Sequence, residues 1–126
     1  MRAIDTNVLV RLIVRDDARQ LRRAEEFVAQ GAWTSHLVLA ETAWVLDSNY
    51  GLSADQIATT VEMLLSHGTL TFQEPEVIAA ALVTFRRHTK VGFSDCLVAE
   101  IARKAGHASL GTFDQGLAKL NACQQL

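Results

Sequence analysis

The first fourteen residues, Met1-Arg2-Ala3-Ile4-Asp5-Thr6-Asn7-Val8-Leu9-Val10-Arg11-Leu12-Ile13-Val14, place an acid between a short segment and a longer apolar one. Residues 2–5 are too few for a useful helix and predict a buried strand. Asp5 ends this strand, and its carboxylate suits the N-cap of a helix that we expect to start around Asn7. The stretch therefore predicts a strand followed at once by a helix, with an acid at the junction.

The same alternation continues along the chain. Short segments that suit buried strands recur at residues 32–34, 70–72 and 108–111. Helices are predicted after Asp17 (residues 18–30, stopped by Gly31), over residues 36–46, after the capping box that begins at Ser53, from Pro75 onward, and after Ser94 as N-cap. Strands that alternate with helices predict crossover connections. The fold class is therefore α/β, a three-layer α/β/α sandwich with a mostly parallel central sheet.

Length and composition fit one compact domain. The chain has 126 residues, of which 49 % are hydrophobic and 21 % charged, and it holds only seven glycines and one proline. A folded chain of this size exposes about 6,600 Å² of the roughly 20,000 Å² of its unfolded form, which leaves enough buried surface for one core. We therefore expect a single domain over residues 1–126.

The sequence contains no candidate membrane span, since its apolar runs are interrupted well before the ~20 residues that a span requires. Asp5 follows Met1 too closely for a signal-peptide apolar region, so a cytoplasmic location is expected. Two isolated cysteines and four histidines without ligand spacing predict neither a disulfide framework nor a zinc site.

A net charge of −2 excludes a protein that holds nucleic acid by bulk positive charge. Basic residues are nevertheless concentrated in the first quarter of the chain and again at Arg86, Arg87, His88 and Lys90. We expect Arg86, Arg87 and Lys90 to contact a polyanion at the rim of the functional crevice. The alternative is that both groups are solvated helix faces.

Three acids stand where an α/β sheet places its functional crevice, beyond the carboxyl ends of the strands, and a fourth lies within a helix. Asp5 ends the first strand, Asp114 follows the last predicted strand, and Asp95 opens a helix after a glycine-containing loop. Glu41 interrupts an otherwise apolar helix, where a carboxylate must be paired, exposed or bound to a metal. Individually, Asp5 could be an N-cap, Asp95 a first-turn acid and Asp114 a turn residue.

Carboxylates brought together at one crevice repel each other and bind hard divalent cations through oxygen, so the expected cofactor is Mg²⁺ or Mn²⁺. Without a cation, such a cluster would reject a phosphate. With one, it can hold a scissile phosphate and lower the pKa of an attacking water.

The segments around these acids resemble the successive signatures of PIN-domain ribonucleases, in order and over essentially the whole chain. They are Ile4-Asp5-Thr6-Asn7-Val8-Leu9, Ala40-Glu41-Thr42, Phe93-Ser94-Asp95-Cys96-Leu97-Val98-Ala99 and Gly111-Thr112-Phe113-Asp114. The sequence as a whole is similar to VapC-type toxins of bacterial toxin–antitoxin pairs. The resemblance implies a PIN-like fold, metal-dependent endoribonuclease activity, homodimerisation, and inhibition by a VapB-type antitoxin whose tail occupies the active site.

Position by position, Asp5, Glu41 and Asp95 match the family's core metal-binding acids, and Asp114 matches a fourth, more variable acid. Thr112 matches a hydroxyl often found before that acid, while Asn7 and Thr6 match polar residues that brace the first acid. Gly116 stands where some relatives carry a further acid, which leaves a second metal site open.

Other classes fit the sequence less well. A haloacid-dehalogenase phosphatase needs a second acid where this chain has Asn7, and a response-regulator receiver needs paired early acids. Cys96 lies in an apolar context that favours a packed residue over a nucleophile. A PIN-like RNA-processing nuclease without an antitoxin, or a non-catalytic RNA-binding module, stays open as an alternative.

The apolar residues of the first quarter suit either core packing or a partner interface; they are Val8, Leu9, Leu12, Ile13, Leu21, Phe27 and Val28.

Overall fold

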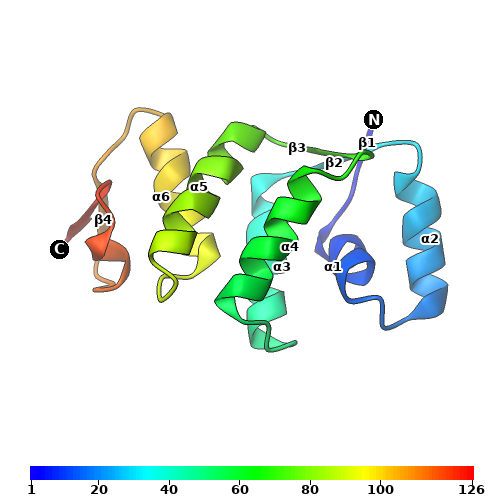
Figure 1. Cartoon of the computed structure of the whole chain (residues 1–126). Coiled ribbons are helices and arrows are strands. Elements are labelled where there is room, and N and C mark those ends of the chain that lie inside the picture. The colour runs from blue at the N-terminus through cyan, green and yellow to red at the C-terminus, as the bar shows by residue number, and fades with distance from the viewer.

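The computed structural model describes all 126 residues, and its elements alternate as the sequence predicts (Figure 1). The strands are β1 (Arg2–Ala3), β2 (Ala32–Thr34), β3 (Leu70–Phe72), β4 (Leu110–Thr112) and β5 (Cys123–Gln125). The α-helices are α1 (Thr6–Val14), α2 (Ala18–Val28), α3 (His36–Ser48), α4 (Ala54–Leu65), α5 (Pro75–Arg87) and α6 (Phe93–Lys104), and a 3₁₀ turn, η1, spans Leu117–Lys119.

All strand pairs are parallel, which confirms the α/β fold class. The strands are distributed over two sheets, one in the order β1-β2-β3 and the other β4-β5. In the first sheet Ala3 lies opposite Trp33, and Trp33 lies opposite Thr71. In the second, Gly111 lies opposite Gln124. The strand β5 lies in a polar C-terminal segment with no apolar run, so the sequence did not predict it.

Local side-chain chemistry sets the helix boundaries. The Asp17 carboxylate accepts a hydrogen bond from the Gln20 amide, and Ser53 and Gln56 form the predicted capping box. Gly31 ends the segment that follows α2 and has a φ of +90°, a backbone conformation that residues with a Cβ atom rarely adopt. These signals are local, which is why the sequence predicted these boundaries well.

Several predicted boundaries were wrong by one or two residues. The first strand ends at Ala3, because Asp5 serves as the N-cap of α1, which begins at Thr6 and not at Asn7. The last predicted strand shifts from residues 108–111 to 110–112. Gly92, not Ser94, is the N-cap of α6, so the Ser94 hydroxyl is free to bond elsewhere.

The core is one cluster of 25 buried residues that runs through the whole chain. Helices α5 and α6 pack closely, and the rings of Phe85 and Phe93 meet edge to face with centroids 5.7 Å apart. Leu9 and Val28 are buried, and Val8, Leu12, Ile13 and Phe27 pack against the same core. Most of the apolar surface in the first quarter is thus used in the core.

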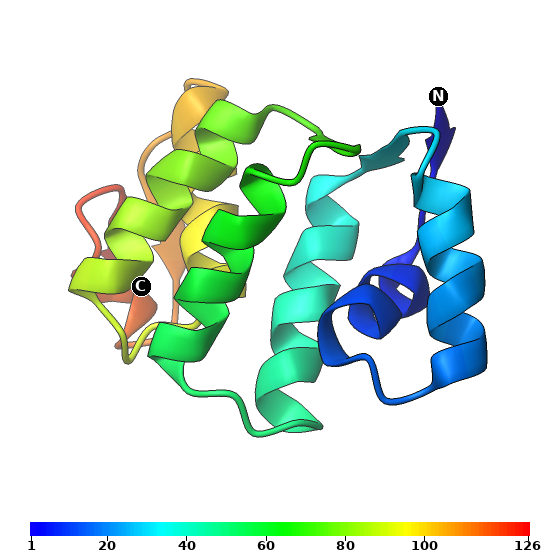
Figure 2. The same cartoon turned by 45° about the vertical axis from the view of Figure 1, so that its right-hand side comes forward.

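The sheet β1-β2-β3 lies along one edge of the molecule, between α5 and α2, and β4 lies beyond α6 at the end of the molecule opposite α2 (Figures 1 and 2). Helices α1 and α2 lie at the end that carries β1, and the C-terminus lies beside β4 at the other end. The four acids are therefore spread along the molecule, on or beside α1, α3, α6 and β4.

None of the helices combines the length and the apolar character that crossing a bilayer requires.

Candidate functional site

Asp5 lies at the carboxyl end of β1 and caps α1. Its Oδ1 accepts a hydrogen bond of 3.2 Å from the amide of Val8. The residue is exposed and lines a surface cavity of about 400 Å³ between α1 and α2, together with Asn7, Arg11 and Arg23. The carboxylate therefore has one structural contact and remains accessible to solvent.

Thr6 and Glu41 join α1 to α3. The Thr6 hydroxyl donates a hydrogen bond of 2.9 Å to Oε2 of Glu41. Glu41 is exposed, which explains how an apolar helix tolerates a carboxylate in its middle. Thr6 has the bracing role that the sequence suggested, but it acts on Glu41 and not on Asp5.

Ser94 and Asp95 lie in the first turn of α6. The Ser94 hydroxyl donates a hydrogen bond of 2.9 Å to the carbonyl of Ala40, the residue before Glu41. This contact fixes the start of α6 against α3. Burial, and secondly the charge of Asp114, raise the pKa of Asp95 above its ordinary value. Asp95 and Asp114 are thus close enough to repel each other.

Asp114 follows β4 in a tight turn. Its amide donates to the Thr112 hydroxyl at 3.0 Å, and its Oδ1 accepts from the amide of Leu117 at 2.9 Å, where η1 begins. Thr112 thus supplies the expected neighbouring hydroxyl, and it orients the turn rather than the carboxylate. Asp114 itself is exposed.

These contacts link the acid-bearing elements in one order. Thr6 contacts Glu41, Ala40 contacts Ser94, and Asp95 faces the charge of Asp114. The four acids therefore lie on or directly beside elements that contact one another, from α1 through α3 and α6 to β4.

The donor set consists of carboxylate and hydroxyl oxygens, which is the ligand chemistry that Mg²⁺ and Mn²⁺ prefer. However, no group of three His, Cys, Asp or Glu side chains comes together closely enough to hold a metal ion. The residue types fit a hard cation, whereas their arrangement in the single chain does not form a coordination site.

The predicted RNA-contacting residues differ in their surroundings. Arg86 donates to Oε2 of Glu62 on α4 at 2.9 Å. Arg87 and Lys90 are exposed and form no ion pair. All three precede α6, so they lie near the helix end that carries Asp95.

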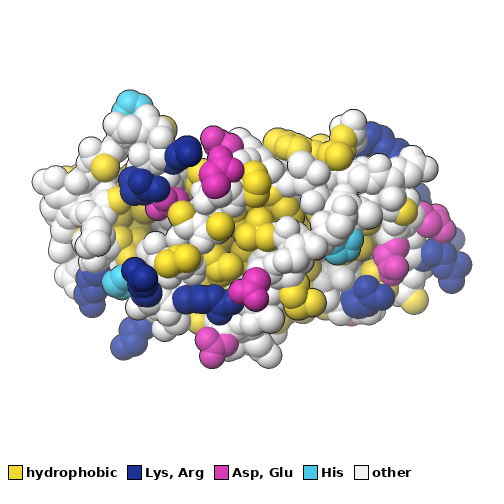
Figure 3. Space-filling model, turned by 45° about the horizontal axis from the view of Figure 1, so that its top comes forward, with side chains coloured by type: hydrophobic (Ala, Val, Ile, Leu, Met, Phe, Trp, Pro, Cys, Tyr) yellow, Lys and Arg dark blue, Asp and Glu magenta, His cyan; other side chains and the backbone are white.

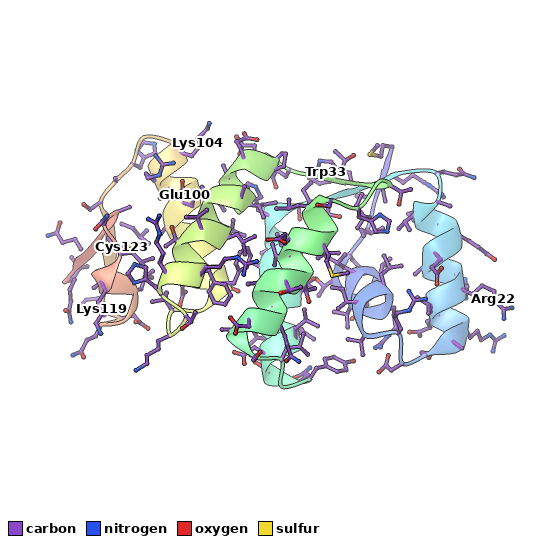
Figure 4. The ribbon with its side chains drawn as sticks, in the orientation of Figure 1. Arg22, Trp33, Glu100, Lys104, Lys119 and Cys123 are labelled. Carbon is purple, nitrogen blue, oxygen red and sulfur yellow. The ribbon has the colours of Figure 1, made fainter.

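Sequence reasoning missed the role of Ser94, which it expected as a cap, although a hydroxyl directly before an acid was a visible signal. It also missed Cys123 and Glu100. Cys123 lies near Asp95, since burial and then the Asp95 charge raise the pKa of its thiol. Glu100 is buried on α6 and pairs with Arg103. Figure 4 shows Glu100 on α6 and Cys123 near the C-terminus, where β5 begins.

Comparison with known proteins gives one match. Neither the curated proteins nor the solved structures contain a match to this chain. A sequence model for the PIN domain matches residues 3–122, a range that includes all four acids and nearly the whole chain. The parallel strands, the alternating helices and this match together agree with a PIN-like α/β/α fold. This chain belongs to the PIN domain family.

Proposed function

We propose that this protein is an endoribonuclease that depends on Mg²⁺ or Mn²⁺ and cleaves phosphodiester bonds of RNA. The observation that carries the proposal is the PIN domain match over residues 3–122, because PIN domains are generally nucleases. Asp5, Glu41, Asp95 and Asp114 are the catalytic acids of the proposal. They support it by lying on elements that contact one another, three of them near strand or helix ends and Glu41 within α3.

Electrostatics support the metal requirement. Four carboxylates repel a phosphodiester, and the raised pKa of Asp95 reflects its burial and, secondly, repulsion from Asp114. A divalent cation would offset this charge, and PIN domains usually use such ions. Zinc should substitute poorly, because the four proposed ligands are all carboxylates, which suit the harder ions Mg²⁺ and Mn²⁺.

We further propose that the protein is the toxin of a VapBC-type pair, with a small antitoxin as its partner and the homodimer as its active form. The support is the resemblance of its four signature segments, in order, to VapC-type toxins, and a length typical of them.

The activity is tested on purified protein with single-stranded RNA. Cleavage should occur with Mg²⁺ or Mn²⁺ and stop in excess EDTA. Asp95→Asn, purified in the same way, controls for contaminating nuclease and should not cleave. Binding of RNA without cleavage under any metal condition would contradict the enzyme and favour the non-catalytic RNA-binding module.

The toxin assignment is tested separately in cells. Induction of this chain alone should arrest growth, and co-expression of its cognate VapB-type antitoxin should restore growth. RNA cleavage in vitro without growth arrest would contradict the toxin and favour an RNA-processing nuclease.

A further inference from the structure

A small cavity lies between α5, α6 and the C-terminal segment. It is lined by the end of α5 with His88, by one face of α6 from Cys96 to Arg103, and by residues 120–122. None of the four acids lines it. Its volume is about 230 Å³, below the range of about 300–1,000 Å³ that is typical of sites for drug-sized ligands. This α5–α6 cavity therefore has room for one small molecule, or for one part of a larger molecule.

The α5–α6 cavity has an apolar floor and a polar rim. Cys96, Ala99 and Leu120 line it and are at most 4 % exposed, so they form its deep part. Arg87 and Asn121 line it and are exposed, so they stand at its mouth. A ligand that matches both parts has an apolar, compact body and a polar or charged end.

Glu100 brings a buried carboxylate with one unused oxygen to the cavity. The residue is 9 % exposed, and its Oε1 accepts a hydrogen bond of 2.8 Å from Nε of Arg103 and a second one from Nη2 of the same side chain. Its other oxygen, Oε2, accepts no hydrogen bond from the chain. Because buried polar atoms are stabilised by a partner, a ligand that donates an N–H or O–H group to Oε2 fits this wall.

Positive charge is in excess around the cavity. Arg103 is paired with Glu100, whereas Arg87 and His88 form no ion pair. In Figure 3, Lys, Arg and His side chains lie over the end of the molecule that carries α6 and β4. Because the guanidinium of arginine matches the geometry of a phosphate with two N–H groups, this rim favours a phosphate-bearing anion.

We propose that the α5–α6 cavity binds one nucleotide. The base lies against Ala99 and Leu120, an amino group at its edge donates to Oε2 of Glu100, and the phosphate meets Arg87 and His88. Adenine, cytosine and guanine carry such an amino group, and uracil does not. Inorganic phosphate alone would leave the apolar floor and Glu100 without a partner. This site goes beyond the proposed cleavage, which is not needed for nucleotide binding.

The test is an NMR titration of isotope-labelled, full-length protein with AMP, CMP, UMP and inorganic phosphate. EDTA is present throughout, so that no divalent cation bridges a phosphate to the four acids. AMP and CMP should give saturable shifts at the amides of Ala99, Glu100 and Ala122. UMP should bind about tenfold more weakly, because it offers no amino group to Glu100, and inorganic phosphate should bind weakest.

Variants locate the binding and separate its parts. Arg87→Ala should weaken AMP and UMP equally, by about tenfold. Lys104→Ala removes the same charge from α6 outside the cavity, and this matched control should bind like wild type. Glu100→Gln carries an amide that both donates and accepts, so it should bring AMP and UMP to similar affinity. Arg87 is exposed, so its variant keeps the test valid if Glu100→Gln does not fold.

Two results would overturn the inference. One is the absence of saturable shifts at the cavity amides with every nucleotide. The other is equal affinity of Arg87→Ala and Lys104→Ala for AMP. Nucleotide binding by a chain that never cleaves RNA would support the inference and contradict only the proposed function.

Competition distinguishes the two sources of such a nucleotide. The cavity residue Cys96 directly follows Asp95, which places the cavity beside the proposed catalytic acids. If a nucleotide of bound RNA fills the cavity, AMP should displace a short fluorescent RNA in EDTA, and Arg87→Ala should weaken both ligands. If a free nucleotide fills it, saturating AMP should leave RNA binding unchanged. Either result supports nucleotide binding and identifies its source.

Discussion

The hydroxyl of Thr6 donates a hydrogen bond of 2.9 Å to the carboxylate of Glu41, across 35 positions of sequence. Thr6 is the first residue of α1, and Glu41 lies in the middle of α3. This bond therefore holds one acid of the candidate site beside the start of the helix that another acid, Asp5, caps.

Replacing Thr6 by Val keeps the side-chain shape and removes this hydrogen bond. We expect the free energy of unfolding to fall by about 0.5–1.5 kcal/mol. The rate of RNA cleavage should fall by a larger fraction than the free energy of unfolding, because Glu41 becomes free to rotate. Thr6→Ser retains the hydroxyl and is the control. Urea unfolding and initial cleavage rates measure the two effects, and equal activity of Thr6→Val and Thr6→Ser would contradict a positioning role.

Asp95→Asn should abolish cleavage and leave the fold intact. Burial and the Asp114 charge raise the pKa of Asp95 above its ordinary value of 3.8 in the folded chain, so the folded state binds its proton more tightly than the unfolded chain. Wild-type stability therefore falls as pH rises through the unfolded pKa toward the folded one, and the asparagine variant escapes this loss. In chelator, its melting temperature should match wild type near about pH 3 and exceed it near about pH 7.

The opposite sign would identify Asp95 as a helix-start acid. Loss of its interaction with the dipole of α6 costs about 0.3–1 kcal/mol, which lowers the melting temperature. Added Mg²⁺ should raise the wild-type midpoint more than that of Asp95→Asn, because a ligand of the folded state stabilises it. A lower midpoint with cleavage retained would contradict the metal-site assignment.

The Cys96 thiol should stay neutral and unreactive at mildly alkaline pH. Burial, followed by the charges of Asp95 and Cys123, raises its pKa from 9.0 to about 11. Because the unfolded chain ionises first, stability should fall as pH rises from 9.0 to about 11. Cys96→Ala should show a smaller fall. Alkylation of Cys96 in native protein at a rate equal to that of an unfolded control would contradict its burial.

Arg87 and Arg86 should differ in RNA binding, because only Arg86 is paired with an acid, Glu62. Removing one side chain that neutralises a phosphate lowers the slope of log K against log salt by about 0.7 for single strands. Arg87→Ala and Lys90→Ala should each show this reduction, and Arg86→Ala a smaller one. Glu62→Gln, which frees Arg86, should strengthen binding slightly. Unchanged affinity and slope for all three basic residues would leave them as a solvated helix end.

The sequence alone predicted the fold class, most helix boundaries and the four candidate acids. It did so because caps, glycine stops and apolar periodicity act within a few residues, as at Asp17, at Ser53 with Gln56, and at Gly31. An acid in an apolar run, as at Glu41, or at the end of a predicted strand, as at Asp5, is equally visible without a structure.

Only the tertiary structure decided which groups meet. The contacts of Thr6 with Glu41 and of Ser94 with Ala40 join residues 35 and 54 positions apart, and no local pattern encodes such a separation. The division of five strands into two sheets was equally hidden, since strand pairing depends on hydrogen bonds between distant segments. Residue types therefore determined the chemistry available to this chain, whereas long-range packing determined which of its acids and hydroxyls lie together.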